Sequence, residues 1–279
     1  MQVLFLGIFN LTALLLKYLS AVFLLSLSIM STAQSPWVET KGSFYTGLTA
    51  TSISYTNIFN DDGDSVENTF ETQDRTFSLY GSYSISDRTA VIVDLPFKAV
   101  SSDGTDLSAL GDLKLGIKHE LLQGFPLTAY VTYTAPTATR EFALRTGYAQ
   151  HAVNLGLSTG FSKGKTFGYF GSGFQYREEI PNQIIIDTEI GTKASLGSKD
   201  LFLIFRIDGA FNLEEVADPV GDRSVLYHNN GSYLSPGIKI GLNLINDLWL
   251  NFGTYGAITA RNQAAAPSLS LGIAWKYSK

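Results

Sequence analysis

The sequence contains no cysteine. Disulfide bonds, thiolate metal sites and cysteine nucleophiles are therefore excluded. Charged residues are sparse, at 16%, and the formal net charge is −5 at pH 7. This mildly acidic balance argues against a nucleic acid partner, because nucleic-acid-binding proteins present a basic surface to the phosphates.

Long apolar runs are also missing, except near the N-terminus. There, two apolar segments flank Lys17, and the small residues Ser31, Thr32 and Ala33 follow. One cation, a short apolar run and small residues before a cleavage point are typical of a secretory signal. The sequence therefore predicts a signal peptide over residues 1–33, cleaved after Ala33, and a single domain over residues 34–279.

The region before Lys17 is unusually apolar for the start of a signal peptide, which leaves two alternatives open. Translation starts nearer Leu15, or the segment Val3–Ile29 is a transmembrane anchor. The anchor is disfavoured because a lysine in the middle of a bilayer is costly. No cysteine follows Ala33, which argues against a lipoprotein.

Beyond Ala33, no segment approaches the roughly 20 consecutive apolar residues that a membrane-spanning helix needs. Aromatic residues are frequent, at 13%, and there are 26 glycines. This composition favours an all-β chain.

Alternation of apolar and polar residues is the main structural signal. Residues 234–244 have apolar side chains at every even position, and residues 112–118 have them at odd positions. Patterns of this kind predict twelve strands, at 42–58, 75–86, 88–100, 111–121, 126–136, 150–162, 166–177, 184–195, 200–212, 232–244, 247–260 and 267–277.

The predicted connections differ in length between the two ends of the strands. Those after even-numbered strands are tight turns, whereas most of those after odd-numbered strands are long and polar, including 60–74, 101–110, 138–149 and 213–231. Short turns at one end, long loops at the other and an even strand count are typical of transmembrane β-barrels. The fold class is therefore an all-β, transmembrane antiparallel barrel in the bacterial outer membrane, with both termini in the periplasm and lipid as a partner. A soluble β-sandwich is the alternative, although its loops need not alternate in this way.

The less apolar face of the strands carries the charges, which cannot line the dry interior of a sandwich. We expect these residues to line the barrel lumen: Asp94, Lys98, Asp112, Lys114, Lys118, Glu120, Asp187, Glu189, Lys193, Arg206, Asp208 and Lys239. Acids and bases are equally numerous, so ion pairs are expected to close much of the lumen. Twelve strands lie between the eight whose interior side chains fill and the sixteen or more that leave a channel.

Aromatic residues are expected in two settings. An aromatic track along the lumen would contain Tyr80, Tyr130, Phe170 and Phe174. Girdles at the two membrane interfaces are predicted from residues near strand ends, namely Phe97, Tyr133, Tyr176, Phe211 and Tyr233 at the loop side and Phe161, Phe167, Trp249 and Tyr277 at the turn side.

Residues 111–118, Gly-Asp-Leu-Lys-Leu-Gly-Ile-Lys, resemble a strand of the outer-membrane barrels of the phenol-degradation (MetA-type) pathway family. That family follows this strand with a short turn and a strand ending in Pro-Thr-Gly, where this chain has Pro136 and Thr137 but Ala138 in place of the glycine. The similarity is specific over residues 42–137. It implies a barrel that passes small aromatic compounds, and it carries over no catalytic residues.

Candidate catalytic and metal sites are weak. His119 is predicted on the apolar face near the turn side, where an outer-membrane lipase needs its histidine, but no serine with an orienting partner can be placed beside it. The acidic segment 60–64 fails as a calcium loop because Ile58 would occupy the first ligand position. No catalytic residue, metal or cofactor is therefore expected.

Taken together, the residues predict a non-enzymatic barrel that passes a small, aromatic or hydrophobic solute through a narrow lumen. A closed structural or surface-interaction barrel is the second hypothesis, and a lipid-modifying enzyme is the third. The solute, the oligomeric state and any gating are not encoded in a readable pattern.

Overall fold

The computed structural model describes residues 35–141, 144–197, 199–216, 225–245 and 247–278. The predicted signal peptide, residues 1–33, lies outside the described residues. Among the described residues, no helix is long and apolar enough to cross a membrane.

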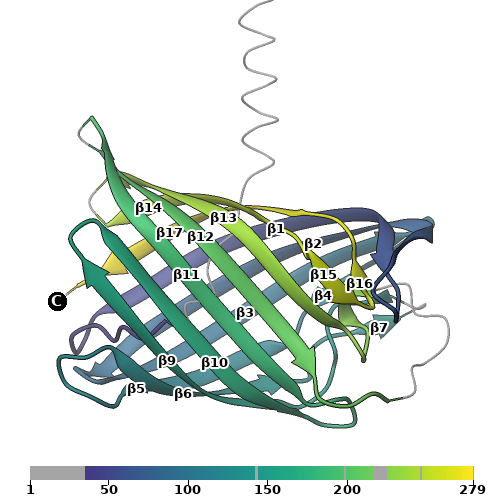
Figure 1. Ribbon diagram of the computed structural model, residues 1–279, viewed down its shortest axis with the longest axis horizontal. Coiled ribbons are helices and arrows are strands. Elements are labelled where there is room, and N and C mark those ends of the chain that lie inside the picture. Colours follow the sequence, from purple (N-terminus) through teal and green to yellow (C-terminus); the bar gives the residue numbers. More distant parts are fainter. Residues whose placement is uncertain (1–34, 142–143, 198, 217–224, 246, 279) are drawn as a thin grey trace, which may run out of the picture.

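The chain forms a closed antiparallel barrel whose wall contains twelve strands, as the sequence predicted (Figure 1). Ten wall strands are single elements: β1 (Phe44–Phe59), β2 (Ser65–Ser86), β3 (Thr89–Ser102), β6 (Leu127–Ala135), β9 (Ala152–Lys163), β10 (Thr166–Arg177), β11 (Gln183–Leu196), β12 (Lys199–Asn212), β13 (Ser232–Ile245) and β17 (Ser268–Tyr277). The other two are composite, β4 (Thr105–Leu110) with β5 (Leu113–Glu120) and β14 (Leu248–Tyr255) with β15 (Thr259–Arg261). Short elements in the loops are β7 (Arg140–Glu141), β8 (Leu144–Arg145), β16 (Gln263–Ala264) and the 3₁₀ turn η2 (Val225–Tyr227).

Closure of the barrel is made by the first and last strands. Phe44 of β1 pairs with Tyr277 of β17, and the ladder continues without interruption to the pair of Ile53 with Ser268. The next neighbours around the wall are β14, β13 and β12, so no strand edge is left open. The start of β1 and the end of β17 both lie at the side of the short turns.

The outward face of the wall is apolar and the inward face is polar. Outward side chains on adjacent strands, such as Leu203, Ile240 and Phe252, are 38–49% exposed. Residues one position away, such as Lys239 and Asn251, are buried inside the barrel. An apolar outer band around a polar lumen is the arrangement that a bilayer requires of a β-barrel.

The prediction of two loops was wrong, because much of each segment forms a strand. Strand β2 begins at Ser65, so the loop predicted over 60–74 shrinks to a turn at 60–64. Residues 105–110, predicted as part of a loop, form β4, which pairs with the end of β3. Both segments lie at the loop end of the barrel, where neither face needs an apolar side chain, so the alternation that marks the other strands is missing.

The expected facing of several aromatic residues was also wrong. Phe170 and Phe174 of the predicted lumen track point outward, at 50% and 41% exposure, whereas Tyr80 and Tyr130 are buried inside. Phe167 and Trp249, predicted for the turn-side girdle, instead flank Phe202. Tyr233, predicted for the loop-side girdle, lines the internal cavity. Strand β10 carries aromatic rings on both faces, so hydrophobicity alone does not distinguish its inner face from its outer face.

The two ends of the barrel are expected to differ in protease sensitivity on intact cells. Added protease should cleave within 213–231 or the turn at 60–64, because these connections lie at the loop end that we place outside the cell. The tight turn at Lys163, Gly164 and Lys165, where Gly164 has a φ of 63°, should be protected. Cleavage at that turn without lysis, mapped by mass spectrometry, would reverse the orientation.

Candidate functional site

The lumen contains a cavity of about 440 Å³. This volume falls in the range of roughly 300–1,000 Å³ that is typical of small-molecule sites. Five tyrosines contribute to its wall, Tyr80, Tyr130, Tyr148, Tyr233 and Tyr255. Eight charged residues do so as well, Asp94, Asp112, Lys114, Arg177, Asp187, Arg206, Asp208 and Lys239.

Seven of the twelve residues expected along the lumen border this cavity, and the other five lie elsewhere on the inner face. Glu189 is buried beside Lys239, and Lys98 lies near the loop end. Lys118 lies toward the turn end, where it borders a second hollow of about 220 Å³. Glu120 ends β5, and Lys193 pairs with Asp200 at 2.7 Å with both side chains about 40% exposed, so these two lie at the turn-side rim.

Paired charges form one side of the cavity, on strands β11, β12 and β13. Arg206 Nη2 lies 2.7 Å from Asp208 Oδ1, and Arg206 Nε lies 3.6 Å from Asp187 Oδ1. The hydroxyl of Tyr169 donates to Asp187 at 2.9 Å. These contacts follow from the register, which sets Asp187 opposite Asp208. The cluster links β11 and β12 through one guanidinium that two carboxylates share.

A second pair lies beside this cluster. Lys239 Nζ of β13 donates to Glu189 Oε1 of β11 at 2.5 Å across the intervening strand β12. Both side chains are nearly inaccessible to solvent, at 7% and 2% exposure. Removing either partner would leave the other charge buried without compensation.

The segment before β1 fills the turn end of the lumen. Lys118 donates to the carbonyl of Ser35 at 3.3 Å, and Thr128 donates to that of Pro36 at 2.5 Å. The ring of Trp37 meets the ring of Tyr169 edge to face, with 6.1 Å between centroids. Because Lys118, Thr128 and Tyr169 all face inward, residues 35–37 lie inside the barrel.

Two connections cover the loop end. The one between β12 and β13 contributes Tyr227, whose hydroxyl donates to Asp74 Oδ2 at 2.6 Å. Lys98 lies 3.5 Å from Asp74 Oδ1 and 4.8 Å from the centre of the Tyr227 ring. Burial and the neighbouring Asp74 carboxylate raise the pKa of Tyr227 well above its ordinary value, so its hydroxyl remains a donor at physiological pH. Arg145 of the other connection donates to the Tyr227 carbonyl at 3.2 Å.

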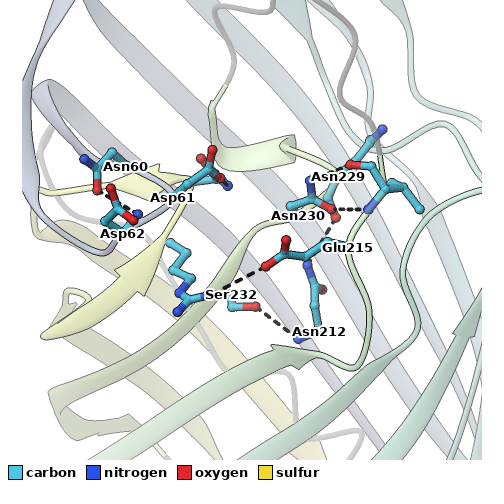
Figure 2. A network of polar contacts seen from close by, with 11 residues as sticks. Asn60, Asp61, Asp62, Asn212, Glu215, Asn229, Asn230 and Ser232 are labelled. Atoms are coloured by element: carbon cyan, nitrogen blue, oxygen red, sulfur yellow. Dashed lines mark hydrogen bonds and ion pairs between the residues drawn. The ribbon is translucent and has the colours of Figure 1, made fainter.

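Polar contacts between loops extend this cover (Figure 2). Arg261 lies 3.5 Å from Glu215, and Asn262 donates to Asp61. Asn230 binds both the amide and the carbonyl of Val216, at 3.0 and 2.7 Å. These bonds join the loops that precede β2, β13 and β17 to one another.

Asp112 explains part of the motif at 111–118. Its carboxylate accepts the backbone amides of Tyr148 at 2.7 Å and of Ala138 and Ala149 at 3.2 Å. The strand is interrupted beside Asp112, opposite Pro96, which has no amide to donate. The Asp112 carboxylate therefore holds the connection between β6 and β9 over the cavity, which brings Tyr148 into its wall.

The candidate catalytic histidine and the candidate calcium loop lack the groups that either function would need among the described residues. The His119 ring lies 2.9 Å from the Thr89 hydroxyl, and no serine or carboxylate joins them among the described residues. Asn60 Oδ1 accepts the amides of Asp62 and Asp64 at 3.0 and 2.8 Å, so the acidic segment is a capped turn. Within the described ranges, no group of three His, Cys, Asp or Glu residues is arranged to hold a metal ion.

Several residues of the site were missed from the sequence. Arg177 borders the cavity but was overlooked because the facing of β10 was assigned incorrectly; Tyr176 at the expected girdle position already implied that Arg177 faces inward. Tyr148 and Tyr227 lie in connections without periodicity, so nothing in the sequence marked them.

The closed twelve-stranded wall, apolar outside and hollow inside, defines the class of protein as a transmembrane β-barrel of the outer-membrane type. No protein-family model matches the sequence, and no curated protein matches it significantly. The structure is similar to an outer membrane channel from Pseudomonas putida F1, with a TM-score of 0.67 and 15% identity over 87% of this chain and 98% of that chain. This similarity shows a shared fold.

Two more distant structures share general barrel character. The translocator domain of the autotransporter NalP from Neisseria meningitidis has a TM-score of 0.45 and 11% identity, over 85% of this chain and 89% of that chain. The CymD monoaromatic hydrocarbon channel has a TM-score of 0.45 and 8% identity, over 91% of this chain and 94% of that chain. Both are too dissimilar to support an argument about function.

Proposed function

We propose that this protein is an outer-membrane channel that passes a small aromatic or hydrophobic solute through a narrow lumen. The observation that carries the proposal is the cavity of about 440 Å³ enclosed by the barrel wall, with five tyrosines in its lining. Aromatic rings offer large apolar contact area together with a hydroxyl for orientation. The resemblance of residues 111–118 to barrels of the phenol-degradation family supports the same class of solute.

The narrowness of the path follows from what lies at its two ends. Residues 35–37 occupy the turn end, and Tyr148 and Tyr227 lie under the loop end. Between these two ends, the paired charges of β11, β12 and β13 occupy part of the lumen. A solute therefore has to fit the cavity and pass the side chains at its two ends, which favours small compounds over oligomers.

The same observations favour a second candidate, a barrel whose lumen stays closed and whose loops act as a surface structure. The contacts of Arg261 with Glu215 and of Asn262 with Asp61 tie the loops to one another, which such a role would use. The two candidates differ in one measurable property, the passage of ions and solutes.

Removal of residues 35–38 should increase the conductance of the protein in planar lipid bilayers several-fold. The deletion takes out Pro36 and Trp37, which fill the turn end against Thr128 and Tyr169. Trp37→Ala should have a smaller effect of the same sign. Trp37→Phe, which preserves an aromatic contact with Tyr169, should conduct like the wild type. If neither the wild type nor the deletion conducts, the closed barrel becomes the better account.

A further inference from the structure

Arg177, the last residue of β10, is a buried cation with no acidic partner among the residues that the structure describes. Its side chain is 4% exposed. Nε donates to the Pro181 carbonyl at 2.5 Å, and Nη2 donates to Asn212 Oδ1 at 3.0 Å and lies 3.4 Å from the Asn229 carbonyl. Nη1 has no hydrogen-bond partner, and no carboxylate of the described residues lies within ion-pair distance of the guanidinium.

Three other cations near the cavity have acidic partners, unlike Arg177. Arg206 is shared by two aspartates, Lys239 binds Glu189, and Lys98 binds Asp74. A buried charge without a counter-ion is costly and is usually paired or bound to a ligand. Polar contacts with Pro181 and Asn212 satisfy some of the Arg177 donors, but they do not neutralise its charge.

A second cation, the exposed Lys114, lies on the same row of the wall. Cross-strand register joins Lys114 to Thr134, Thr134 to Ala152, and Ala152 to Arg177. Lys114 borders the cavity and forms no ion pair within the described part of the chain. Its register neighbour Asp94 accepts a hydrogen bond from Ser78 and lies beyond ion-pair distance.

A second acid lies at this end of the cavity. Asp112 also borders the cavity, and its carboxylate is directed at the amides of Ala138, Tyr148 and Ala149. The Arg177 end of the cavity therefore combines two cations, Arg177 and Lys114, with two acids, Asp94 and Asp112, and neither acid is within ion-pair distance of the Arg177 guanidinium. Because the formal charges balance, this end accommodates a monoanion better than a phosphate dianion.

We propose that this end of the cavity binds the carboxylate of a small aromatic acid, with Arg177 and Lys114 as the cationic partners. The proposal rests on the proposed function, because it names the chemical class of the solute that enters the same lumen. A planar carboxylate matches the geometry of a guanidinium edge. The aromatic ring of the ligand then lies along the cavity toward Tyr130. The Tyr130 hydroxyl occupies space that is open only because Gly156 and Gly173 have no side chain.

Tyr148 regulates access to the guanidinium. Its ring centre is 5.2 Å from Arg177 Cζ, so it covers one face of the group. Tyr148 belongs to the connection between β6 and β9 and not to the wall. A carboxylate reaches the guanidinium only if this ring moves, and a rotation of the Tyr148 side chain would leave the hydrogen bonds between the wall strands intact.

Binding of 4-hydroxybenzoate to the purified full-length protein in detergent, measured by calorimetry, tests this proposal. The neutral analogue 4-hydroxybenzamide is the matched ligand control. The wild type should bind the acid at least about tenfold more tightly than the amide, since a hydrogen bond to a charged group contributes roughly 1.5–3 kcal/mol. Arg177→Gln should lose that preference, Arg177→Lys should retain most of it, and Lys114→Gln should reduce it.

Lys165→Gln removes an equal charge at an exposed turn and should leave both affinities unchanged. Lys114→Gln carries the same test if Arg177→Gln does not assemble, because the Lys114 side chain forms no ion pair that the barrel depends on. Equal affinity for acid and amide in the wild type, or a preference that survives both Arg177→Gln and Lys114→Gln, would overturn the proposal.

The experiment separates this proposal from the channel itself. If proteoliposomes pass the amide and the acid equally and the protein shows no preference in binding, the channel stands and the anion site falls. If the protein binds the acid through Arg177 but neither compound crosses the bilayer, the anion site is supported and the solute channel is contradicted.

Discussion

Arg206→Ala is expected to lower the free energy of unfolding of the barrel by about 3–5 kcal/mol, the cost of breaking a buried charge cluster by removing one partner. The substitution leaves Asp187 and Asp208 opposite each other without the guanidinium that both contact. Repulsion between the two carboxylates should loosen the ladder between β11 and β12. The same excess of negative charge should make the lumen more cation-selective.

Urea titration of protein folded into phospholipid vesicles measures the first effect, and reversal potentials in a salt gradient measure the second. Combining Arg206→Met with Asp208→Asn should recover part of the lost stability, because it removes one of the two carboxylates left without the guanidinium. Lys193→Ala breaks an ion pair whose partners are 43% and 39% exposed, and should cost less than about 1 kcal/mol. Wild-type stability and selectivity in Arg206→Ala would mean that the cluster neither supports the wall nor borders the ion path.

Ile240→Arg should lower the free energy of unfolding by about 2–4 kcal/mol, because it places a cation on the lipid face near the middle of a strand. Ile240 lies on β13 between Leu203 and Phe252 of the flanking strands, and all three side chains are exposed on the apolar outer face. Folding yield in vesicles and heat modifiability on gels report the loss of assembly.

The matched control uses the same substitution at the end of the same strand. Ile245→Arg lies at the turn side, where the interface hydrates the guanidinium, and should cost at most about 1 kcal/mol. Equal effects of the two substitutions would contradict a bilayer around β13. Lys239→Ala, one residue from Ile240, should also destabilise the barrel, because it removes the buried partner of Glu189.

The strands of the wall were largely predictable because a bilayer imposes one rule on their outer face. Ile238, Ile240 and Leu242 alternate with Lys239 and Gly241, and this pattern gave β13 almost to its bounds. The rule does not apply to the first part of β2 or to β4, so both were taken for loops. The inward face of β10 was predicted incorrectly, because Phe167 and Phe170 place similar rings on opposite faces of the strand.

The filling of the lumen was beyond prediction from one sequence. Trp37 and Tyr227 reach their positions through segments that have no periodic pattern, and each binds residues distant in the chain. The charges of the inner face were recognisable as a set, but their pairing was not. That Arg206 is compensated and Arg177 is not depends on which strands are neighbours and on which side chains reach across them.

The most direct test of the channel is the uptake of labelled 4-hydroxybenzamide into proteoliposomes, compared with protein-free liposomes and with the deletion of residues 35–38. This neutral solute is independent of any charge preference in the cavity. The wild type should carry it faster than lipid alone, and the deletion should carry it faster still, because Pro36 and Trp37 no longer fill the turn end. Uptake equal to that of protein-free liposomes in both proteins would contradict a solute channel.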